Sequence, residues 1–190
     1  MRIFVALDIP DKIHQAIAGL IGKLDRTCRG ARWVRAEGLH VTLKFIGERS
    51  PETVERIEAE LATIRLAAQV EMSFRDVGFF PSERHPRVFW IGIAGTPNLG
   101  ELANEIERRL EPLGIPREQR PFRPHLTLAR FKSEDGLDRL REALRAAGPF
   151  EFGTTRTGEL HLYRSQLKRG GAEYTRLKTF SFAASAGGAG

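Results

Sequence analysis

The chain has 190 residues, of which 41% are hydrophobic, and a formal net charge of +6. This hydrophobic share supports a packed core and excludes wholesale disorder, while the single cysteine, Cys28, excludes a disulfide framework or a cysteine-based zinc site within one chain. The positive charge suits an anionic partner such as nucleic acid. The apolar run that opens the chain is too short for a signal peptide or a membrane span, so we expect a cytoplasmic protein with no membrane contact.

The first half of the chain predicts an opening strand and then a helix, a strand, a helix and two strands. Alternating apolar residues indicate the strands, and apolar residues at helical spacing indicate the helices. The expected elements are a strand over 2–8, a helix near 11–25, a strand over 39–46, a helix that starts at Ser50-Pro51, and strands near 70–79 and 87–94.

The second half predicts the same order again. Its expected elements are a helix that starts at Thr96-Pro97, a strand over 123–130, a helix near 134–146, and strands near 158–164 and 173–182. The two halves, roughly 11–94 and 97–182, therefore form an internal repeat. We expect an α+β fold with one bilobal domain over 1–182: two duplicated lobes, each with an antiparallel sheet and helices, related by a pseudo-twofold axis about a central groove. The small, Gly-rich tail 183–190 is expected to be disordered.

A histidine-threonine motif recurs once in each half, as His40-Val41-Thr42-Leu43 and His125-Leu126-Thr127-Leu128. Side chains alternate faces along a strand, so each histidine shares a face with its threonine, opposite the apolar residues. If the two lobes meet face to face, both pairs line one cleft. The plainer interpretation is two ordinary half-buried strands, in which Thr and apolar residues are natural.

Such a pair of motifs suits chemistry at a phosphate. One neutral and one protonated imidazole can exist at the same pH, so one can accept a proton from a nucleophile while the other donates one to a leaving oxygen. The threonine hydroxyls can hydrogen-bond the phosphate oxygens. A metal site lacks an acidic or third histidine partner beside either motif, and no Walker motif suggests ATP use, so we expect no metal and no cofactor.

Both motifs resemble the signatures of the two-histidine phosphoesterases. The stretch 32–48, RWVRAEGLHVTLKFIGE, resembles the first signature, and 121–130, PFRPHLTLAR, resembles the second. Within that superfamily the chain is most similar to the RNA 2′,3′-cyclic phosphodiesterases, also called 2′-5′ RNA ligases, over about 1–182. The resemblance implies a bilobal α+β fold, hydrolysis of a ribose 2′,3′-cyclic phosphate to a 2′-phosphate, and reversible ATP-independent joining of RNA ends.

The resemblance also implies residue roles. By the family pattern His40 is the proton donor and His125 the proton acceptor, an order that the residues alone leave open. Arg130 matches the family's arginine and suggests a phosphate contact, although strict alternation puts it opposite His125 unless a bulge reorients it. Lys44 and Arg123 share faces with the histidines and could add positive charge to the cleft, with solvated surface as the alternative.

Basic and aromatic residues gather near the expected hairpin tips, a combination that often holds single-stranded RNA. The residues are Arg84, Arg87, Arg164, Lys168, Arg169 and Arg176, with Phe79, Phe80, Tyr163 and Tyr174. Ordinary hairpin charges and core aromatics explain any single one equally well. His14 is expected to be solvated, and His85 and His161 receive no role.

The sequence therefore predicts a monomeric enzyme that hydrolyses RNA 2′,3′-cyclic phosphate ends, tRNA halves being one candidate substrate. Two alternatives stay open: a two-histidine esterase for a small cyclic nucleotide or a 2′-5′ oligonucleotide, and a non-catalytic RNA-binding module. Intact histidines in both motifs count against the binding module, because binding alone needs no proton-transfer pair.

Overall fold

The computed structural model describes residues 1–169 and 171–184. The strands are β1 (Arg2–Leu7), β2 (Ala31–Trp33), β3 (Val41–Glu48), β4 (Val70–Phe80), β5 (Val88–Gly95), β6 (His125–Phe131), β7 (Glu151–Thr157), β8 (Glu159–Lys168) and β9 (Gly171–Ser181). The helices are α1 (Asp11–Leu24), α2 (Pro51–Leu61), α3 (Pro97–Leu110) and α4 (Leu137–Ala147), with the short 3-10 helices η1 (Ala36–Gly38) and η2 (Glu111–Leu113).

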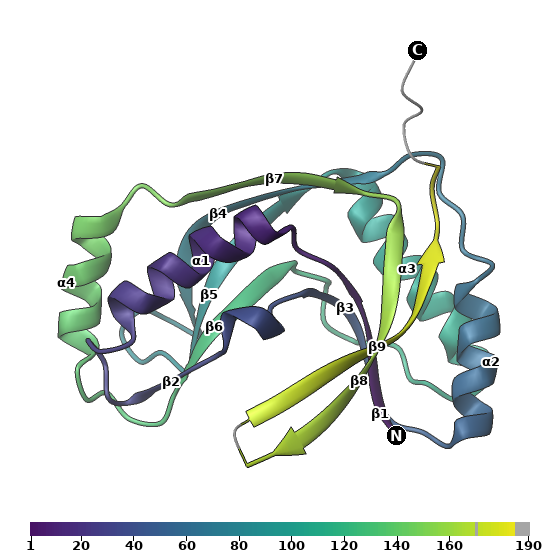
Figure 1. Cartoon of the computed structure of the whole chain (residues 1–190), viewed down its shortest axis with the longest axis horizontal. Helices are drawn as coiled ribbons and strands as arrows, with labels where there is room; N and C mark the ends of the chain where they lie inside the picture. The colour runs from purple at the N-terminus through teal and green to yellow at the C-terminus, as the bar shows by residue number, and fades with distance from the viewer. Residues whose placement is uncertain (170, 185–190) are drawn as a thin grey trace.

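The strands form two antiparallel sheets, which confirms the predicted α+β class. One, here the β3 sheet, has the order β3-β1-β8-β9; the other, the β6 sheet, has the order β2-β6-β5-β4-β7. Helices α2 and α3 pack on each other and α3 contacts β3, while α1 contacts β7. Figure 1 shows α2 and α3 beside the β3 sheet on one side, and α1 and α4 beside the β6 sheet on the other.

Helices α2 and α3 begin where the sequence signals predicted them. Ser50 caps α2 through its side-chain oxygen, which accepts a hydrogen bond from the Thr53 N–H (3.2 Å), and Pro51 is the first helical residue. The buried face of α2 consists of Val54, Ile57 and Leu61, at helical spacing. Helix α4 starts at Leu137 rather than near 134, because Gly136 in the left-handed region (φ 83°) precedes its first turn.

The lobes do not correspond to the two halves of the sequence repeat. The β3 sheet combines β1 and β3 with β8 and β9 from the end of the chain, and the β6 sheet combines β6 and β7 with β4 and β5 from the first half. Each half thus contributes its last strand pair to the sheet that carries the other half's motif. Strands β2 and β7, neither of which was predicted from the sequence, extend the β6 sheet at its two edges.

The end of the described chain belongs to the core. Ala183 is buried, and its N–H donates a hydrogen bond to the Gly158 carbonyl (3.2 Å). The predicted disordered tail therefore starts too early at residue 183. Residues 185–190 of that tail lie outside the described residues. Within the described residues, no helix is long and apolar enough to cross a membrane.

Candidate active site

Strand β3 contains a bulge just after its threonine. Val5 of β1 pairs with Lys44, and the next residue, Ala6, pairs with Thr42, so Leu43 is an extra residue at this point of β3. A bulge of this kind changes which face the following side chains occupy. Leu43 and Lys44 are both buried, and Phe45 is exposed, on the face that strict alternation assigns to Lys44.

The prediction that Lys44 lies on the His40 face is therefore wrong. Its side chain is 7% exposed, and its ammonium group donates to the Glu107 carboxylate and to the Pro116 carbonyl, both at 2.6 Å. The ion pair neutralises a charge that would otherwise be buried alone. Lys44 holds α3 and the chain after η2 against β3, and it adds no charge to the groove.

His40, directly before β3, lies among aromatic rings. Its ring stacks on Phe4 (centroids 4.6 Å apart), lies nearly parallel to Tyr163 (5.7 Å), and meets the edge of Tyr174 (4.9 Å). Burial lowers the pKa of His40 to about 4, although a backbone hydrogen bond at Gly38 and the charge of Asp8 act in the opposite direction. At neutral pH the unliganded His40 is therefore uncharged.

His125, the first residue of β6, is exposed. Its Nδ1 lies 2.8 Å from the carbonyl oxygen of Arg123. Since a carbonyl can only accept, Nδ1 carries the hydrogen, and the neutral ring keeps its lone pair on Nε2. An imidazole held in this tautomer is suited to accept a proton from a nucleophile.

Strand β6 has a bulge at the position equivalent to that of β3. Phe89 of β5 pairs with Ala129 and Trp90 pairs with Thr127, so Leu128 is the extra residue. Leu128 and Ala129 are both buried, whereas Arg130 is exposed. The bulge thus brings Arg130 to the face of His125 and Thr127, which resolves the conflict between strict alternation and a phosphate contact.

Backbone pairing connects the two motifs. Strand β2 pairs antiparallel with the end of β6, and the Val34 N–H continues the ladder by donating to the Leu128 carbonyl (2.9 Å). Because the segments run antiparallel, the chain from Val34 to His40 proceeds toward the His125 end of β6. Figure 1 shows this segment, with η1, between the two sheets.

His14 of α1 fixes the approach to His40. Its Nε2 lies 3.0 Å from the carbonyl oxygen of Leu39, the residue before His40. The expectation that His14 is merely solvated is therefore wrong: its ring is half-buried and ties the motif to α1. Helical spacing placed His14 on the polar side of α1, but could not show that η1 covers that side.

Asp8 gathers a polar cluster next to Tyr163. The Tyr163 hydroxyl donates to Asp8 Oδ1 (2.5 Å), and the Arg176 guanidinium donates to Asp8 Oδ2 and to the tyrosine oxygen, the latter at 3.3 Å. Nε2 of His161 lies 3.5 Å from the same carboxylate, and its Nδ1 lies 2.9 Å from the Thr179 hydroxyl. His161 is 4% exposed, and burial lowers its pKa. The cluster therefore fixes Tyr163 at one side of the His40 ring.

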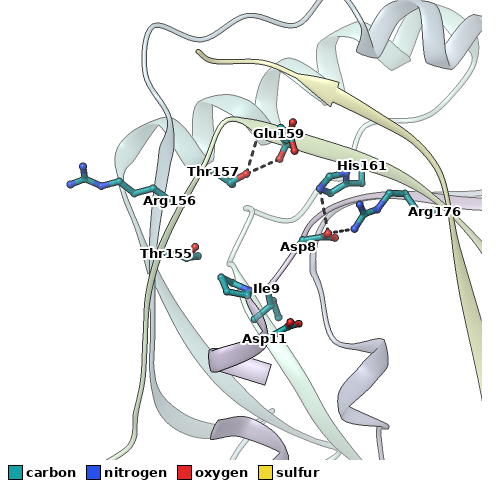
Figure 2. A pocket seen from close by; sticks show the side chains of 10 residues that line it. Asp8, Ile9, Asp11, Thr155, Arg156, Thr157, Glu159, His161 and Arg176 are labelled. Atoms are coloured by element: carbon teal, nitrogen blue, oxygen red, sulfur yellow. Dashed lines mark hydrogen bonds and ion pairs between the residues drawn. The ribbon is translucent and has the colours of Figure 1, made fainter. Parts of the chain in front are cut away.

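A cavity of about 390 Å³ adjoins this cluster (Figure 2). Residues from both sheets line it: Thr155 from β7, His161 from β8 and Arg176 from β9, together with Asp8. The cavity therefore lies between the two sheets, and neither His40 nor His125 is among the residues that line the cavity. Within residues 1–169 and 171–184, no group of three or more His, Cys, Asp or Glu is arranged to hold a metal ion.

Comparison with known proteins identifies the family. The model of the 2′-5′ RNA ligase superfamily matches residues 9–169. The chain belongs to this superfamily. It is 33% identical to an RNA 2′,3′-cyclic phosphodiesterase of Archaeoglobus fulgidus, over 95% of this chain and 99% of that protein. It is 34% identical to one of Methanocaldococcus jannaschii, over 94% and 99%.

Solved structures support the same family. A crystal structure of Escherichia coli LigT complexed with 3′-AMP matches with a TM-score of 0.77 and 29% identity, over 95% of this chain and 97% of LigT. A crystal structure of a Thermus thermophilus protein matches with a TM-score of 0.78 and 32% identity, over 96% and 98%. The predicted resemblance to the 2′-5′ RNA ligases is confirmed.

The remaining predicted site residues lie at or near the surface of the two motif strands. Thr42 is exposed and Thr127 half-buried, each on the face of its histidine, and the Arg123 side chain is exposed just before β6. At the β4–β5 tip the carbonyls of Glu83 and Arg84 accept from Arg141 of α4, so this tip lies against α4.

Proposed function

We propose that the chain is an RNA 2′,3′-cyclic phosphodiesterase, a phosphoric diester hydrolase that opens the cyclic phosphate to a 2′-phosphomonoester. The observation that carries the proposal is the pair of motifs with matched bulges, one histidine enclosed by rings and the other held in a base-competent tautomer. Two differently placed imidazoles are what acid–base transfer at a phosphate requires. The names of the relatives support the same reaction.

In the proposed reaction His125 Nε2 takes a proton from water as the water oxygen attacks phosphorus. His40 donates a proton to the 3′-oxygen as the P–O3′ bond breaks, which leaves the phosphate on the 2′-oxygen. Each proton transfer contributes about 10²–10⁴-fold. The hydroxyls of Thr42 and Thr127, with the Arg130 guanidinium, stabilise the charge on the non-bridging oxygens.

The role of His40 as the proton donor requires that its ring be protonated when the substrate is bound. His40 is neutral in the unliganded protein because burial lowers its pKa to about 4. As the acid, His40 must therefore gain its proton together with the substrate, whose phosphate charge favours the imidazolium. The His40 donor and His125 acceptor roles follow the family pattern, and a substrate with sulfur in place of the leaving 3′-oxygen tests them.

The same site supports ligation. An RNA 5′-hydroxyl can replace water as the nucleophile at the cyclic phosphate, and departure of the 3′-oxygen then leaves a 2′-5′ linkage. The strained ring supplies the free energy, so the step needs no ATP. Monomeric state, cytoplasmic location, a domain over 1–182 and tRNA halves as substrate remain predictions from the sequence.

The direct test is the position of the phosphate in the product. The purified protein is incubated with an oligoribonucleotide that ends in a 2′,3′-cyclic phosphate, and the product is assigned by ³¹P NMR and end-specific digestion. We expect a 2′-phosphate. A 3′-phosphate contradicts the mechanism, and turnover confined to small cyclic nucleotides favours the small-substrate esterase. Binding without turnover of any substrate favours the RNA-binding module.

A further inference from the structure

A tryptophan lies beside the second motif, on the face of the β6 sheet that carries His125 and Thr127. Trp90 of β5 is half-buried between the buried residues Phe89 and Ile91, so its side chain lies on the face opposite the core. Trp90 pairs with Thr127 across the antiparallel ladder. Side chains of directly paired residues share a face and contact each other. The indole is therefore a direct neighbour of the motif threonine.

Two glycines form the floor beneath this ring. Gly78 of β4 pairs with Trp90 on its other side, and a Cβ atom at Gly78 would overlap the indole, so the ring lies directly against the β4 backbone. A Cβ atom at Gly92 would lie 3.4 Å from the indole Cζ3. Because Gly92 pairs with His125, the indole extends from the motif threonine toward the motif histidine.

Core packing does not account for this ring. Among the described residues, Trp90 belongs neither to the hydrophobic core nor to the side chains packed against it. Trp33 of β2, in contrast, packs against that core and meets the Phe89 ring edge-on, with centroids 5.9 Å apart. One face of the Trp90 indole covers glycine backbone, so its other face is directed toward the groove. A flat aromatic surface of this kind is suited to stacking a nucleic acid base.

Two cations lie on the same face as the indole. Arg75 of β4 pairs with Gly92, and Arg130 of β6 pairs with Val88, so both arginines share the face of Trp90. Both side chains are exposed. Stacking on an aromatic ring with positive charge beside it is the combination that holds single-stranded RNA.

The position of Trp90 decides which part of a substrate the indole meets. In the proposed reaction His125 takes the proton of the attacking hydroxyl, and the 3′-oxygen leaves toward His40. The attacking and leaving oxygens lie on opposite sides of phosphorus in such a displacement. The nucleophile therefore enters from the β6 sheet, where Trp90 lies.

We propose that Trp90 stacks the 5′-terminal base of the RNA strand whose 5′-hydroxyl attacks the cyclic phosphate. This inference rests on the proposed function and adds a binding site for the second RNA strand in ligation. In that step the 5′-oxygen bonds to phosphorus and gives its proton to His125, while the P–O3′ bond breaks and the 3′-oxygen receives a proton from His40. Stacking uses the face of a base, so the site accepts any of the four bases.

The test measures ligation and hydrolysis of one cyclic phosphate in the same reaction. An oligoribonucleotide with a 2′,3′-cyclic phosphate end is incubated with increasing concentrations of a trinucleotide that has a free 5′-hydroxyl, using wild type, Trp90→Leu and Trp90→Phe. The ratio of ligated to hydrolysed product should fall about 10-fold in Trp90→Leu, as expected for one lost stacking contact, and largely persist in Trp90→Phe. Trp33→Leu is the matched control, because it removes an indole from the core side of the same sheet.

An incoming strand without the relevant base sharpens the test. A trinucleotide that is abasic at its 5′ end should lower the wild-type ratio by the same factor and leave the ratio of Trp90→Leu unaltered. A ratio in Trp90→Leu equal to that of the wild type overturns the proposal, whether both rates are unchanged or both fall together. If both fall together, Trp90 supports the motif itself rather than the incoming strand. Hydrolysis without ligation at any trinucleotide concentration also overturns the proposal and leaves the phosphodiesterase standing.

A binding measurement separates this inference from the proposed function. Fluorescence anisotropy with the 5′-hydroxyl trinucleotide, labelled at its 3′ end, needs no turnover. We expect the wild type to bind this trinucleotide about 10-fold more tightly than its 5′-abasic form, and Trp90→Leu to bind both equally. That result, found in a protein that opens no cyclic phosphate, supports the stacking site and rejects the phosphodiesterase. Equal affinity of the wild type for both forms rejects the stacking site, whatever the activity.

Discussion

The two motif strands share a bulge after the threonine and differ in the side chain that the bulge exposes. Each has an extra residue directly after its threonine, Leu43 in β3 and Leu128 in β6, and β3 has a second one, Ile46, nearer its end. The residue two positions beyond the bulge then lies on the histidine face: Phe45 in one strand and Arg130 in the other. Repetition of the bulge therefore preserves the geometry at the histidines, while one lobe gains an aromatic surface and the other gains a cation.

The histidines themselves differ in the same way. His40 is enclosed by Phe4, Tyr163 and Tyr174, and burial lowers its pKa, whereas His125 is exposed and held by one carbonyl. The shared His-x-Thr-Leu pattern thus holds two differently placed imidazoles, because the rings around His40 come from β1, β8 and β9, whereas His125 is held by a carbonyl two residues away. This loss of symmetry between the lobes supports the separate acid and base roles proposed for the two histidines.

The largest expected effect tests whether both histidines are required. His40→Ala and His125→Ala should each lower kcat by at least about 10²-fold, because each removes one proton transfer. Thermal melts should first establish that both variants are folded. Near-wild-type turnover by either variant would leave the two-histidine mechanism without support.

A substrate with sulfur at the leaving 3′-position then assigns the roles. A thiolate leaves without a proton, so this substrate should restore turnover to the variant that lacks the acid and not to the variant that lacks the base. We expect rescue of His40→Ala. Rescue of His125→Ala instead would make His125 the acid and His40 the base, while the proposed hydrolysis itself would stand.

The next effect concerns Lys44, the residue that follows the Leu43 bulge of β3. Lys44→Met leaves the Glu107 carboxylate buried without its partner, so the free energy of unfolding should fall by about 3 kcal/mol. Urea denaturation measures this value, and activity per folded molecule should stay near that of the wild type. The double variant Lys44→Met/Glu107→Leu should recover most of the loss; if it does not, Lys44 stabilises the fold by something other than this ion pair.

The environment of His40 also predicts a dependence of stability on pH. Its pKa is lower in the folded state, about 4, than the ordinary value of 6.5, so the unfolded chain binds more protons between these values. The resulting stability is present above pH 6.5 and is lost as the pH falls through this window, by about 3 kcal/mol at pH 4. Comparing denaturation of wild type and His40→Asn at pH 7 and pH 4 isolates this contribution; parallel losses in both proteins would contradict it.

The smallest effect tests the charge beside His40. Asp8 raises the pKa of His40 and of His161, so Asp8→Asn should lower both values further. NMR titration of the imidazole signals measures the two values directly. Asp11→Asn is the matched control because Asp11 lines the same cavity and does not contribute to either shift. A rise of the His40 pKa in Asp8→Asn would contradict the inference that the Asp8 charge stabilises the protonated His40 ring.

Local patterns predicted most of the helices and strands, although not β2 and β7. Helical spacing and the Ser50-Pro51 and Thr96-Pro97 signals placed α2 and α3, and the repeated His-Thr pairs indicated both site strands. The bulges escaped prediction because one extra residue in a ladder depends on the partner strand and has no sequence signal of its own. Lys44 was misplaced and Arg130 left undecided for this single reason.

Long-range features were the harder part. The exchange of strand pairs between the halves arises from pairing of β1 with β8 and of β5 with β6, and periodicity along the chain contains no information on it. Asp8 and His161 escaped notice likewise, because their cluster forms only when β1, β8 and β9 meet. Neither residue stands in a recognisable motif. The hydrogen bond between Asp8 and Tyr163, for example, joins residues 155 positions apart.

The exchanged strand pairs also constrain how the protein can be made. Strand β1 is synthesised well before β8, so one of its edges stays open until β8 follows. Neither motif lobe can close on a nascent half, and contacts of such long sequence separation slow folding. A chain interrupted after residue 95 would leave both sheets incomplete, and the two fragments should regain a folded site only when they are combined.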